Sequence, residues 1–297
     1  MNTPKRPIET ALRETADLIE RALDDALSPE KIGYGATAEA MHYSTLGGGK
    51  RIRAYLTLAF CALCGGRVED ALPFACAVEC VHAYSLIHDD LPAMDNDAMR
   101  RGKPSCHIAY GEATALLAGD ALLTYAFELT SGNRRVSAES ARLATHVLAS
   151  EAGARGMVGG QTLDMQAEFE TIDELTAMVD GKTAALIRAA CFLGVYAATD
   201  SPDPDLLRRV RRYADAVGLG FQIRDDILDV TGDTATLGKE VGSDAKNDKK
   251  TVLAFRDLDE ARLWEASLVR EAEDALDGLP GSGELSELAR WLSRRNK

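Results

Sequence analysis

Proline, aromatic side chains and positive charge are all scarce in this chain of 297 residues. Only nine prolines occur, and none lies between Pro104 and Pro202, an interval rich in strong helix formers. No segment shows sustained alternation of Val, Ile and Thr with polar residues, so strands have little support. Acidic residues number 47 against 34 basic ones, and the net charge of −13 argues against a nucleic-acid surface. The sequence therefore predicts an all-helical protein with no nucleic-acid partner.

Long hydrophobic runs are also missing. Glu79 and Arg188 interrupt the richest stretches before they reach the roughly 18 residues that a membrane span needs. The N-terminal segment is charged from Lys5 to Glu14 and lacks the apolar core of a signal peptide. We therefore expect no membrane span and a cytoplasmic location.

The six cysteines do not form a metal or redox motif. Cys61 and Cys64 make a CxxC, but this pair lies within an apolar helical run. No second CxxC or nearby pair of histidines completes a zinc site. We expect these cysteines to be buried structural thiols.

Helix breakers divide the chain into roughly ten helices. The expected breaks fall at residues 47–49, 65–66, 132–133, 159–160, 201–204 and 278–283. No polar, low-complexity linker splits the sequence, and Asp200–Asp205 is too short to be a flexible tether. The sequence thus predicts one all-α domain over residues 1–297, a bundle of many helices.

Two clusters of aspartate are the strongest chemical signal. Residues 88–97, HDDLPAMDND, pack four acids into nine positions, and residues 225–229, DDILD, pack three into five. A single acidic run is usually a solvated helix face, but each of these runs continues directly from an apolar helix. Neighbouring carboxylates repel unless a cation joins them, and hard oxygen ligands suit Mg²⁺ completed by substrate phosphates. The spacing and the missing glycine exclude an EF-hand.

The helical wheel gives the second cluster two different faces. Each residue turns about 100°, so Asp225 and Asp229 lie about 40° apart. Leu219, Ile223, Ile227 and Val230 point the other way and form an apolar back. We therefore expect a carboxylate front that faces something polar.

Cations stand beside these acidic segments. LGGGKRIR, residues 46–53, places small residues and three cations at a helix start, where backbone N–H groups favour a phosphate. It is not a P-loop, because no strand precedes it and Arg51 stands where Ser or Thr would bind the metal. Further candidates are Arg100, Arg101, Lys182, Thr183, Lys239 and Lys249.

Five segments together resemble one known family. They are AVECVHAYSLIHDDLPAMDNDAMRRGKP, LAGDAL, GGQTLDM, GKTAALIRAA and GFQIRDDILDVTGDTATLGK. These resemble the trans-prenyltransferases (polyprenyl diphosphate synthases), most closely the bacterial farnesyl diphosphate synthases. The resemblance runs from about Leu46 to the terminal Arg295-Asn296-Lys297. It implies a single-domain helical bundle around a central cavity, of the isoprenoid synthase type, that forms a homodimer.

The resemblance also implies a role for individual residues. Mg²⁺, three ions when diphosphate is bound, would be held by Asp89, Asp90 and Asp95 and by Asp225, Asp226 and Asp229. Isopentenyl diphosphate would be bound by Lys50, Arg53, His82 and Arg101. The allylic diphosphate would be bound by Arg100, Lys182, Thr183, Gln222, Lys239 and Lys249. The catalytic set would be Asp89, Asp95, Lys182, Thr183, Gln222 and Asp225. The segment around Lys249 departs from the family pattern, so Lys246 and Lys250 are rivals for its role.

The activity implied by the resemblance is head-to-tail prenyl transfer. Dimethylallyl or geranyl diphosphate would condense with isopentenyl diphosphate to give farnesyl diphosphate and free diphosphate. The alternatives are geranylgeranyl or geranyl diphosphate synthesis, a terpene cyclase, and a non-catalytic isoprenoid-binding subunit. A cyclase would not need the cations for a second diphosphate, and a non-catalytic subunit would not need both acidic segments intact.

Product length is expected to depend on Tyr84 and Ser85, which precede Asp89 by five and four residues. In the resembling family, bulk at these positions forms the floor of the cavity, so an aromatic Tyr84 indicates a fifteen-carbon product. The helical wheel, however, places Ser85 on the Asp89 stripe and Tyr84 away from it, so a core role for Tyr84 is the alternative. The terminal Arg295-Asn296-Lys297 is expected either to close over the isopentenyl site or to be a solvated tail.

Overall fold

The computed structural model describes residues 7–166, 168–232 and 250–295. Most of these residues lie in helices, so the all-helical prediction is confirmed. Internal contacts divide the chain into two compact units. The first comprises Met1–Ala149 and Leu193–Ser201, and the second comprises Ser150–Phe192 and Pro202–Lys297. A single domain over residues 1–297 stays a prediction.

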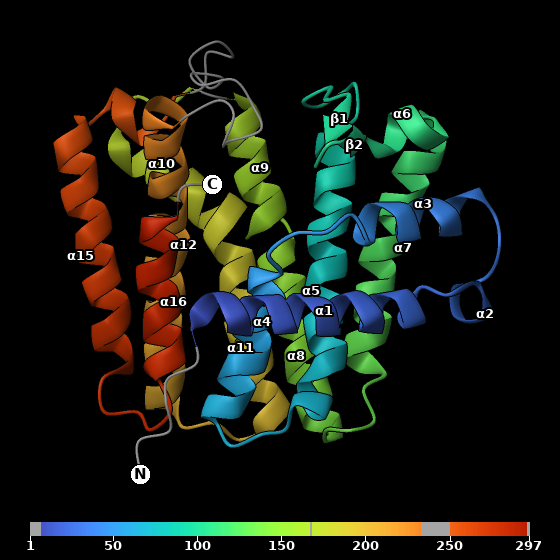
Figure 1. Ribbon diagram of the computed structural model, residues 1–297, viewed down its shortest axis with the longest axis horizontal. Coiled ribbons are helices and arrows are strands. Elements are labelled where there is room, and N and C mark those ends of the chain that lie inside the picture. The colour runs from blue at the N-terminus through green and yellow to red at the C-terminus, as the bar shows by residue number, and fades with distance from the viewer. Residues whose placement is uncertain (1–6, 167, 233–249, 296–297) are drawn as a thin grey trace. The chain divides into compact units, whose positions relative to one another are not determined.

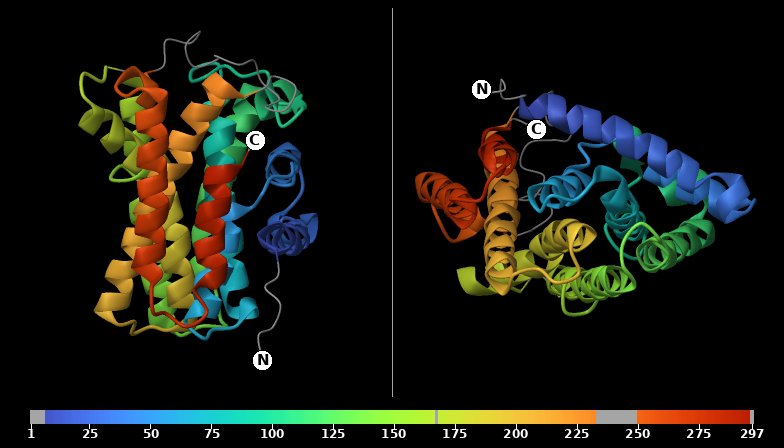
Figure 2. Two further views of the ribbon diagram at one scale, coloured as in Figure 1. Left: turned by 60° about the vertical axis from the view of Figure 1, so that its left-hand side comes forward. Right: turned by 90° about the horizontal axis from the view of Figure 1, so that it is seen from below.

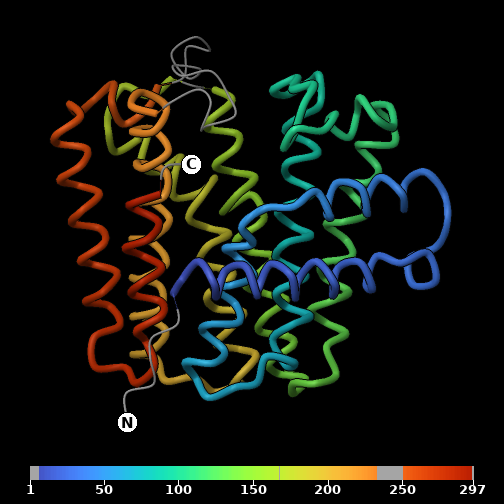
Figure 3. Tube along the Cα trace, viewed as in Figure 1, coloured from blue at the N-terminus to red at the C-terminus, as the bar shows by residue number. Residues whose placement is uncertain are grey.

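The first unit consists of helices and one short hairpin (Figure 1). Its elements are α1 (Ile8–Ala26), α2 (Pro29–Ile32), α3 (Ala36–Thr45), α4 (Ile52–Leu63), α5 (Val68–Asp89), β1 (Met99–Arg100), β2 (Lys103–Pro104), α6 (Cys106–Tyr110) and α7 (Glu112–Ser131). Two further helices, α8 (Ala138–Ala152) and α11 (Ala185–Ala198), contribute residues to both units. After α1 the trace turns back through α2 into α3 (Figure 3).

Helix α5 is the core helix of the first unit. It packs most extensively on α7 and then on α4, while α1 lies against both α4 and α5. By length and composition alone, α5 could cross a bilayer, which differs from the expectation that no run is long enough. Most of its apolar window is buried inside the protein, as in the central helix of a globular unit.

The hairpin β1–β2 was not expected from the sequence. Met99 pairs with Pro104 and Arg100 with Lys103, and the two central residues, Arg101 and Gly102, both have positive φ. Positive φ at both central positions is the geometry of a type I′ turn, which suits the twist of two antiparallel strands. Strands of two residues are too short to show alternation, so the period-two test could not find them.

The second unit is built from long helices around an irregular turn. Its elements are α9 (Met157–Gln166), α10 (Ile172–Val179), the π-helix η1 (Asp180–Ala184), α12 (Pro204–Thr231), the 3₁₀-helix η2 (Val252–Ala254), α15 (Leu258–Leu276) and α16 (Gly283–Arg294). Helices α12, α15 and α16 run side by side (Figure 2).

Local sequence explains several helix starts in this unit. Thr171 and Glu174 form a capping box at the start of α10, and Asp257 and Glu260 form another at the start of α15. Pro204 occupies the first turn of α12, where its missing N–H has no cost.

One expected break is wrong. Residues 159–160 lie inside α9 instead of ending a helix. A Cβ on Gly160 would lie 2.0 Å from the backbone nitrogen of Lys182, so this glycine permits a close approach between α9 and η1. Glycine here serves packing and not a turn.

The cysteines behave as expected. All six are free thiols, and all except the partly exposed Cys64 are buried. Burial raises the pKa of Cys61 to about 12 and also raises the pKa of Cys64. Both members of the CxxC are therefore protonated thiols at neutral pH, as structural cysteines are.

Candidate active site

The first acidic segment begins where α5 ends. Asp89 is the last residue of the helix, and its carbonyl accepts a hydrogen bond of 2.8 Å from the backbone N–H of Asp95. Asn96 then takes a positive φ of 54°. The chain thus folds back on itself and brings the backbone of Asp95 to that of Asp89.

Asp90, unlike its neighbours, is deeply buried and bound to an arginine. It is only 2% exposed, and Nε of Arg100 donates to its two carboxylate oxygens at 3.1 and 3.2 Å. Burial raises the pKa of Asp90, while the hydrogen bond and charge of Arg100 oppose that rise. Two predicted ligands, one for metal and one for diphosphate, are therefore paired with each other here.

The loop before α4 is held by a buried arginine that sequence reasoning passed over. Arg51 lies in the left-handed region and donates to Glu79 at 3.0 Å, to Glu20 at 2.5 Å and to the carbonyl of Thr45 at 2.6 Å. Glu79 also accepts the backbone N–H of Ala54 at 3.1 Å, at the start of α4. This network fixes the backbone on both sides of Arg51, and with it the segment that carries Lys50 and Arg53. The charge of Glu79 within an apolar helix was the available signal.

A cationic cluster forms around His82. Burial lowers the pKa of Arg53, and so does the charge of Arg101, against the opposing effect of Glu79. Burial is also the main reason that the pKa of His82 lies well below its ordinary value, followed by the charges of Arg53 and Arg101. The structure therefore brings together three of the four residues predicted to bind isopentenyl diphosphate. Like charges that lower one another's pKa values favour an anion between them.

Glycine makes room for one member of this cluster. Arg101 donates to the carbonyl of Gly48, and a Cβ on Gly49 would lie 3.1 Å from its guanidinium. Gly49 itself has a φ of 128°, which other residues rarely adopt. In the described part of the chain, three residues other than glycine have positive φ: Arg51, Asn96 and Arg101. All three lie in these motif segments. Such strain concentrates at functional sites.

The second acidic segment lies on α12. Asp226 is buried, accepting hydrogen bonds from the side chain of Gln222 at 2.9 Å and from the backbone N–H of Val252 at 2.8 Å. Asp229 is buried as well, whereas the Asp225 side chain is 42% exposed. The expected carboxylate front is therefore partly enclosed by the protein.

The apolar back of α12 is confirmed at two of the four positions considered, and Leu219 is only partly buried. Ile223 and Ile227 are buried, as predicted, but Val230 is 57% exposed. Val230 is the penultimate residue of the helix, which ends at Thr231, so its side chain lies at the helix end. The helical wheel could not show where the packed part of the helix stops.

Arg295 is docked on the second acidic segment and is not a solvated residue. It donates to a carboxylate oxygen of Asp225 at 2.6 Å, and its guanidinium lies 3.9 Å from the ring centre of Phe221. Arg224 in turn donates to the Arg295 carbonyl at 2.7 and 2.9 Å. Burial lowers the pKa of Arg295, while Asp225 opposes that shift. Asn296 and Lys297 lie outside the described residues.

Lys182, Thr183 and Gln222 are connected within the second unit. Lys182 and Thr183 belong to the π-helix η1, and Nζ of Lys182 lies 2.5 Å from a carboxylate oxygen of Asp164. Thr183 donates to the side-chain carbonyl of Gln222 at 3.3 Å. The pairing of Lys182 with Asp164 was not foreseen, although GGQTLDM contains that aspartate.

Of the other lysines considered as ligands of the allylic diphosphate, only Lys250 lies within the described residues. Lys239, Lys246 and Lys249 lie outside the described residues. Lys250, a rival for the role of Lys249, donates to the carbonyl of Phe169 at 2.7 Å.

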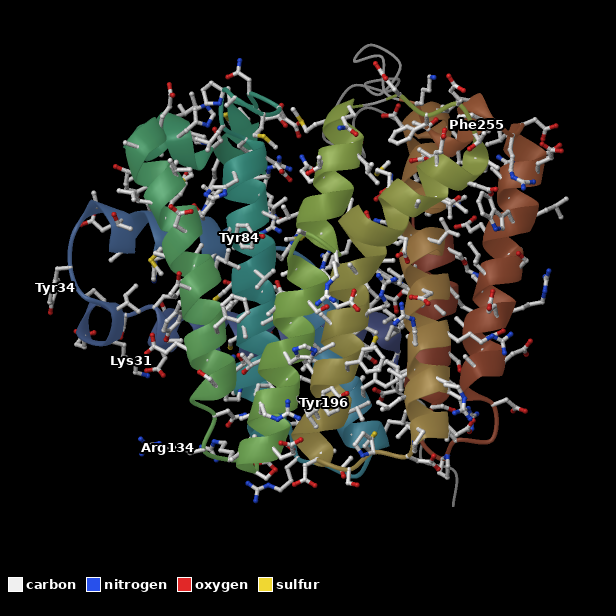
Figure 4. All side chains as sticks on the ribbon, turned by 180° about the vertical axis from the view of Figure 1, so that it is seen from behind. Lys31, Tyr34, Tyr84, Arg134, Tyr196 and Phe255 are labelled. Carbon is white, nitrogen blue, oxygen red and sulfur yellow. The ribbon has the colours of Figure 1, made fainter. Side chains whose placement is uncertain are left out.

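Tyr84 is buried on α5, where Figure 4 labels it. Its ring meets that of His88 edge to face, with centroids 5.7 Å apart. His88 donates to the carbonyl of Leu116 on α7, and a Cβ on Gly119 would lie 2.1 Å from its ring. Tyr84 therefore packs beside the residue that precedes Asp89. Ser85 donates to the carbonyl of His82 at 2.9 Å.

The acidic residues fit an ion that is shared with a substrate. Within residues 7–166, 168–232 and 250–295, no three His, Cys, Asp or Glu side chains are grouped closely enough to hold a metal. Asp89, Asp95 and Asp225 are at least partly exposed, whereas Asp90, Asp226 and Asp229 are buried. Mg²⁺ commonly takes one or two carboxylates and completes its shell with water and phosphate, so this donor set suits it.

Comparison with known proteins gives consistent matches over nearly the whole chain. Residues 35–275 match the family described as polyprenyl synthetase. Farnesyl diphosphate synthase from Haemophilus influenzae is 42% identical over 286 residues, covering 96% of this chain and 97% of that protein. Farnesyl diphosphate synthase from Escherichia coli is 43% identical over 285 residues, covering 93% and 95%.

Solved structures agree with these matches. The crystal structure of geranylgeranyl pyrophosphate synthetase from Pyrococcus horikoshii aligns with a TM-score of 0.87 and 29% sequence identity. The alignment covers 97% of this chain and 98% of that one.

Proposed function

Because the chain belongs to the polyprenyl synthetase family, we propose that it condenses dimethylallyl or geranyl diphosphate with isopentenyl diphosphate. The product is farnesyl diphosphate, and diphosphate is released. The farnesyl diphosphate synthases of H. influenzae and E. coli, similar over more than nine-tenths of the chain, support this activity.

The observation that carries the proposal is the cationic cluster of Arg53, His82 and Arg101. A terpene cyclase needs one diphosphate site, whereas a condensing enzyme needs two. In the second unit, Lys182, Thr183 and Gln222 supply a separate polar set for the allylic diphosphate. Two separate sets favour condensation over cyclisation and over a non-catalytic binding role.

In this mechanism, Asp89 and Asp95 in the first unit and Asp225 in the second would hold Mg²⁺, which would supply positive charge against the allylic diphosphate. Arg100 and Lys182 are the proposed cations for the allylic diphosphate, where positive charge would stabilise the negative charge that develops as the C–O bond breaks. Arg53 and Arg101 orient isopentenyl diphosphate so that its double bond attacks the allylic carbon. Loss of a proton, which the departing diphosphate can accept, completes the product. The Thr183 hydroxyl and the Gln222 amide would stabilise the positive charge that develops on the allylic carbon.

The buried acidic residues have a different role in this proposal. Asp90 holds Arg100, and Asp226 holds Gln222, so each positions a residue that binds substrate. Arg295 provides the charge opposite Asp225, and a phosphate bound nearby would be a second partner for its guanidinium.

The two diphosphate sites should be separable by mutation. We expect Arg53→Ala to raise the KM for isopentenyl diphosphate, and Lys182→Ala to raise the KM for geranyl diphosphate, each by about tenfold or more through loss of a charge-assisted contact. Steady-state kinetics with each substrate varied in turn measures both values. Arg142→Ala, which removes an exposed arginine that is paired with Glu139, is the matched control. Equal changes in both KM values in both variants would contradict this assignment.

The location and assembly also belong to the proposal. We place the enzyme in the cytoplasm as a homodimer, in keeping with its family. Light scattering coupled to gel filtration should give about twice the chain mass of 31.9 kDa. A mass of one chain at micromolar concentration would contradict the dimer.

A further inference from the structure

Arg188 is a buried arginine to which the mechanism above gives no role. It lies on α11 within the second unit and is 3% exposed. Its Nε donates to Glu151 at 3.1 Å, and its Nη1 donates to Asp215 at 2.8 Å and to Asp180 at 2.5 Å. Burial would lower the pKa of Arg188, but the hydrogen bonds to Asp180 and Asp215 outweigh it and raise the pKa above its ordinary value.

Asp180 is bound more completely than the other two carboxylates. Nη2 of Arg188 also donates to its second carboxylate oxygen at 3.2 Å and to its backbone carbonyl at 3.4 Å. Asp180 is the first residue of η1, which contains Lys182 and Thr183. Arg188 therefore binds both the backbone and the side chain of Asp180, at the start of the turn that contains two predicted substrate ligands.

A π-helical turn is wider than an α-helical one and needs support from its surroundings. Its i to i+5 hydrogen bonds accommodate one extra residue and rotate the side chains that follow relative to those before. Such turns are rare and frequent at functional sites. Without support, the segment would relax to α-helix, and Lys182 and Thr183 would point in other directions.

Two close approaches hold the turn from either side. A Cβ on Gly160 of α9 would lie 2.0 Å from the Lys182 nitrogen, and a Cβ on Gly218 of α12 would lie 2.4 Å from the Cβ of Ala184. Asp215 lies on α12 three residues before Gly218, so Arg188 ties the start of the turn to the helix packed against its end. Arg188 makes five hydrogen bonds with the five N–H donors of its planar guanidinium, and lysine, with three donors on one nitrogen, cannot reproduce them all.

The later part of the turn is also hydrogen-bonded to α12. Thr183 donates to Gln222, and Gln222 donates to Asp226 of the second acidic segment. Displacing the turn would therefore misplace Lys182, Thr183 and Gln222 together.

We propose that Arg188, through Asp180 and Asp215, is a positioning residue that holds the π-helical turn in the register in which Lys182 and Thr183 bind the allylic diphosphate. This rests on the proposed function for the identity of the ligand. Arg188 itself does not touch substrate. Glu151, its third partner, belongs neither to the turn nor to α12 and provides a matched control.

Kinetics of three variants test the proposal: Asp180→Asn, Arg188→Lys and Glu151→Gln. We expect the first two to raise the KM for geranyl diphosphate about tenfold, with less than about twofold change for isopentenyl diphosphate. Glu151→Gln, which removes a charge from the same arginine, should leave both values near wild type. Equal effects in all three variants, or equal effects on both KM values, would overturn the proposal.

Hydrogen–deuterium exchange keeps this test separate from that of the proposed function. Amides of residues 180–184 should exchange faster in Asp180→Asn and Arg188→Lys than in the wild type, and at the wild-type rate in Glu151→Gln. If the wild type made no prenyl product, the proposed function would fail while this measurement still decided whether Arg188 holds the turn. Unchanged exchange in Arg188→Lys would overturn its positioning role.

Discussion

His82 shows how one residue's surroundings become a measurable pH dependence. Burial and the neighbouring arginines hold the folded-state pKa of His82 well below its ordinary value of 6.5. As pH falls through 6.5, His82 takes up a proton in the unfolded chain but not in the folded protein. The contribution of His82 to the free energy of unfolding is therefore fully present above this pH and is lost as pH falls below it. In the proposed function, a neutral His82 would still have one ring N–H to donate to a phosphate.

We predict that His82→Gln removes part of this acid sensitivity. Between about pH 7.5 and about pH 5.5, the variant should lose less free energy of unfolding than the wild type, as measured by urea denaturation. His146→Gln changes an exposed histidine and should leave the wild-type loss unchanged. If wild type and His82→Gln lost the same amount, His82 would not be held neutral.

We predict that Tyr84 limits product length, as the sequence indicates for an aromatic residue five positions before Asp89. Tyr84→Ala, supplied with farnesyl and isopentenyl diphosphates, should yield twenty-carbon or longer products by liquid chromatography of the hydrolysed prenols. Tyr84→Phe keeps the bulk of the ring and should stop at fifteen carbons. An active Tyr84→Ala that also stops at fifteen would mean that Tyr84 is only a packing residue beside His88.

Candidate site residues could be predicted where residues of one chemical type are grouped within a short segment of the sequence. The aspartates of residues 88–97 and 225–229 stand in runs, and the cations stand beside glycines, so both could be found by spacing. The pairs Arg51–Glu79 and Arg100–Asp90 could not be found in this way, because each forms only when separate elements pack. Glu79 was read merely as an interruption of an apolar run, although a buried charge needs a partner.

Two glycines on α12 should respond in opposite ways to substitution by alanine. A Cβ on Gly218 would lie 2.4 Å from the Cβ and 2.6 Å from the Cα of Ala184, which cannot move away without shifting η1. A Cβ on Gly220 would meet only Leu268, at an ordinary 3.7 Å. The two positions share one helix and differ in what packs against them.

We predict that Gly218→Ala lowers the free energy of unfolding by about 1–3 kcal/mol through overpacking. Gly220→Ala should raise it by about 0.4–1 kcal/mol, because alanine restricts the unfolded chain and suits a helix interior. Urea denaturation of both variants beside the wild type measures the difference. Two changes of the same sign would show that the close approach of α12 to η1 does not exist.

Helices were predictable because proline is absent from most of them and the apolar pattern is helical. The hairpin of residues 99–104, the π-helical turn and the path of the chain at residues 159–160 were not. The strands of the hairpin are too short to show a period. The π-helical turn is held by Arg188, and the chain at residues 159–160 is fixed by the close approach of Gly160 to Lys182. An element that is stabilised only by tertiary packing has no hydrophobic periodicity of its own in the sequence.

For the whole molecule, the account requires metal and both acidic segments. Asp89→Ala and Asp225→Ala should each reduce turnover by roughly 10²–10³ or more, as the loss of a preorganised charge does. Circular dichroism controls for folding. Near-normal turnover in both variants would contradict the metal sites.

The most direct test of the central claim is the product of the purified enzyme. With dimethylallyl diphosphate, an excess of isopentenyl diphosphate and Mg²⁺, we expect farnesyl diphosphate to accumulate together with released diphosphate, and excess EDTA to abolish both. No elongated prenyl diphosphate in the presence of Mg²⁺, or substantial turnover in EDTA, would contradict the account.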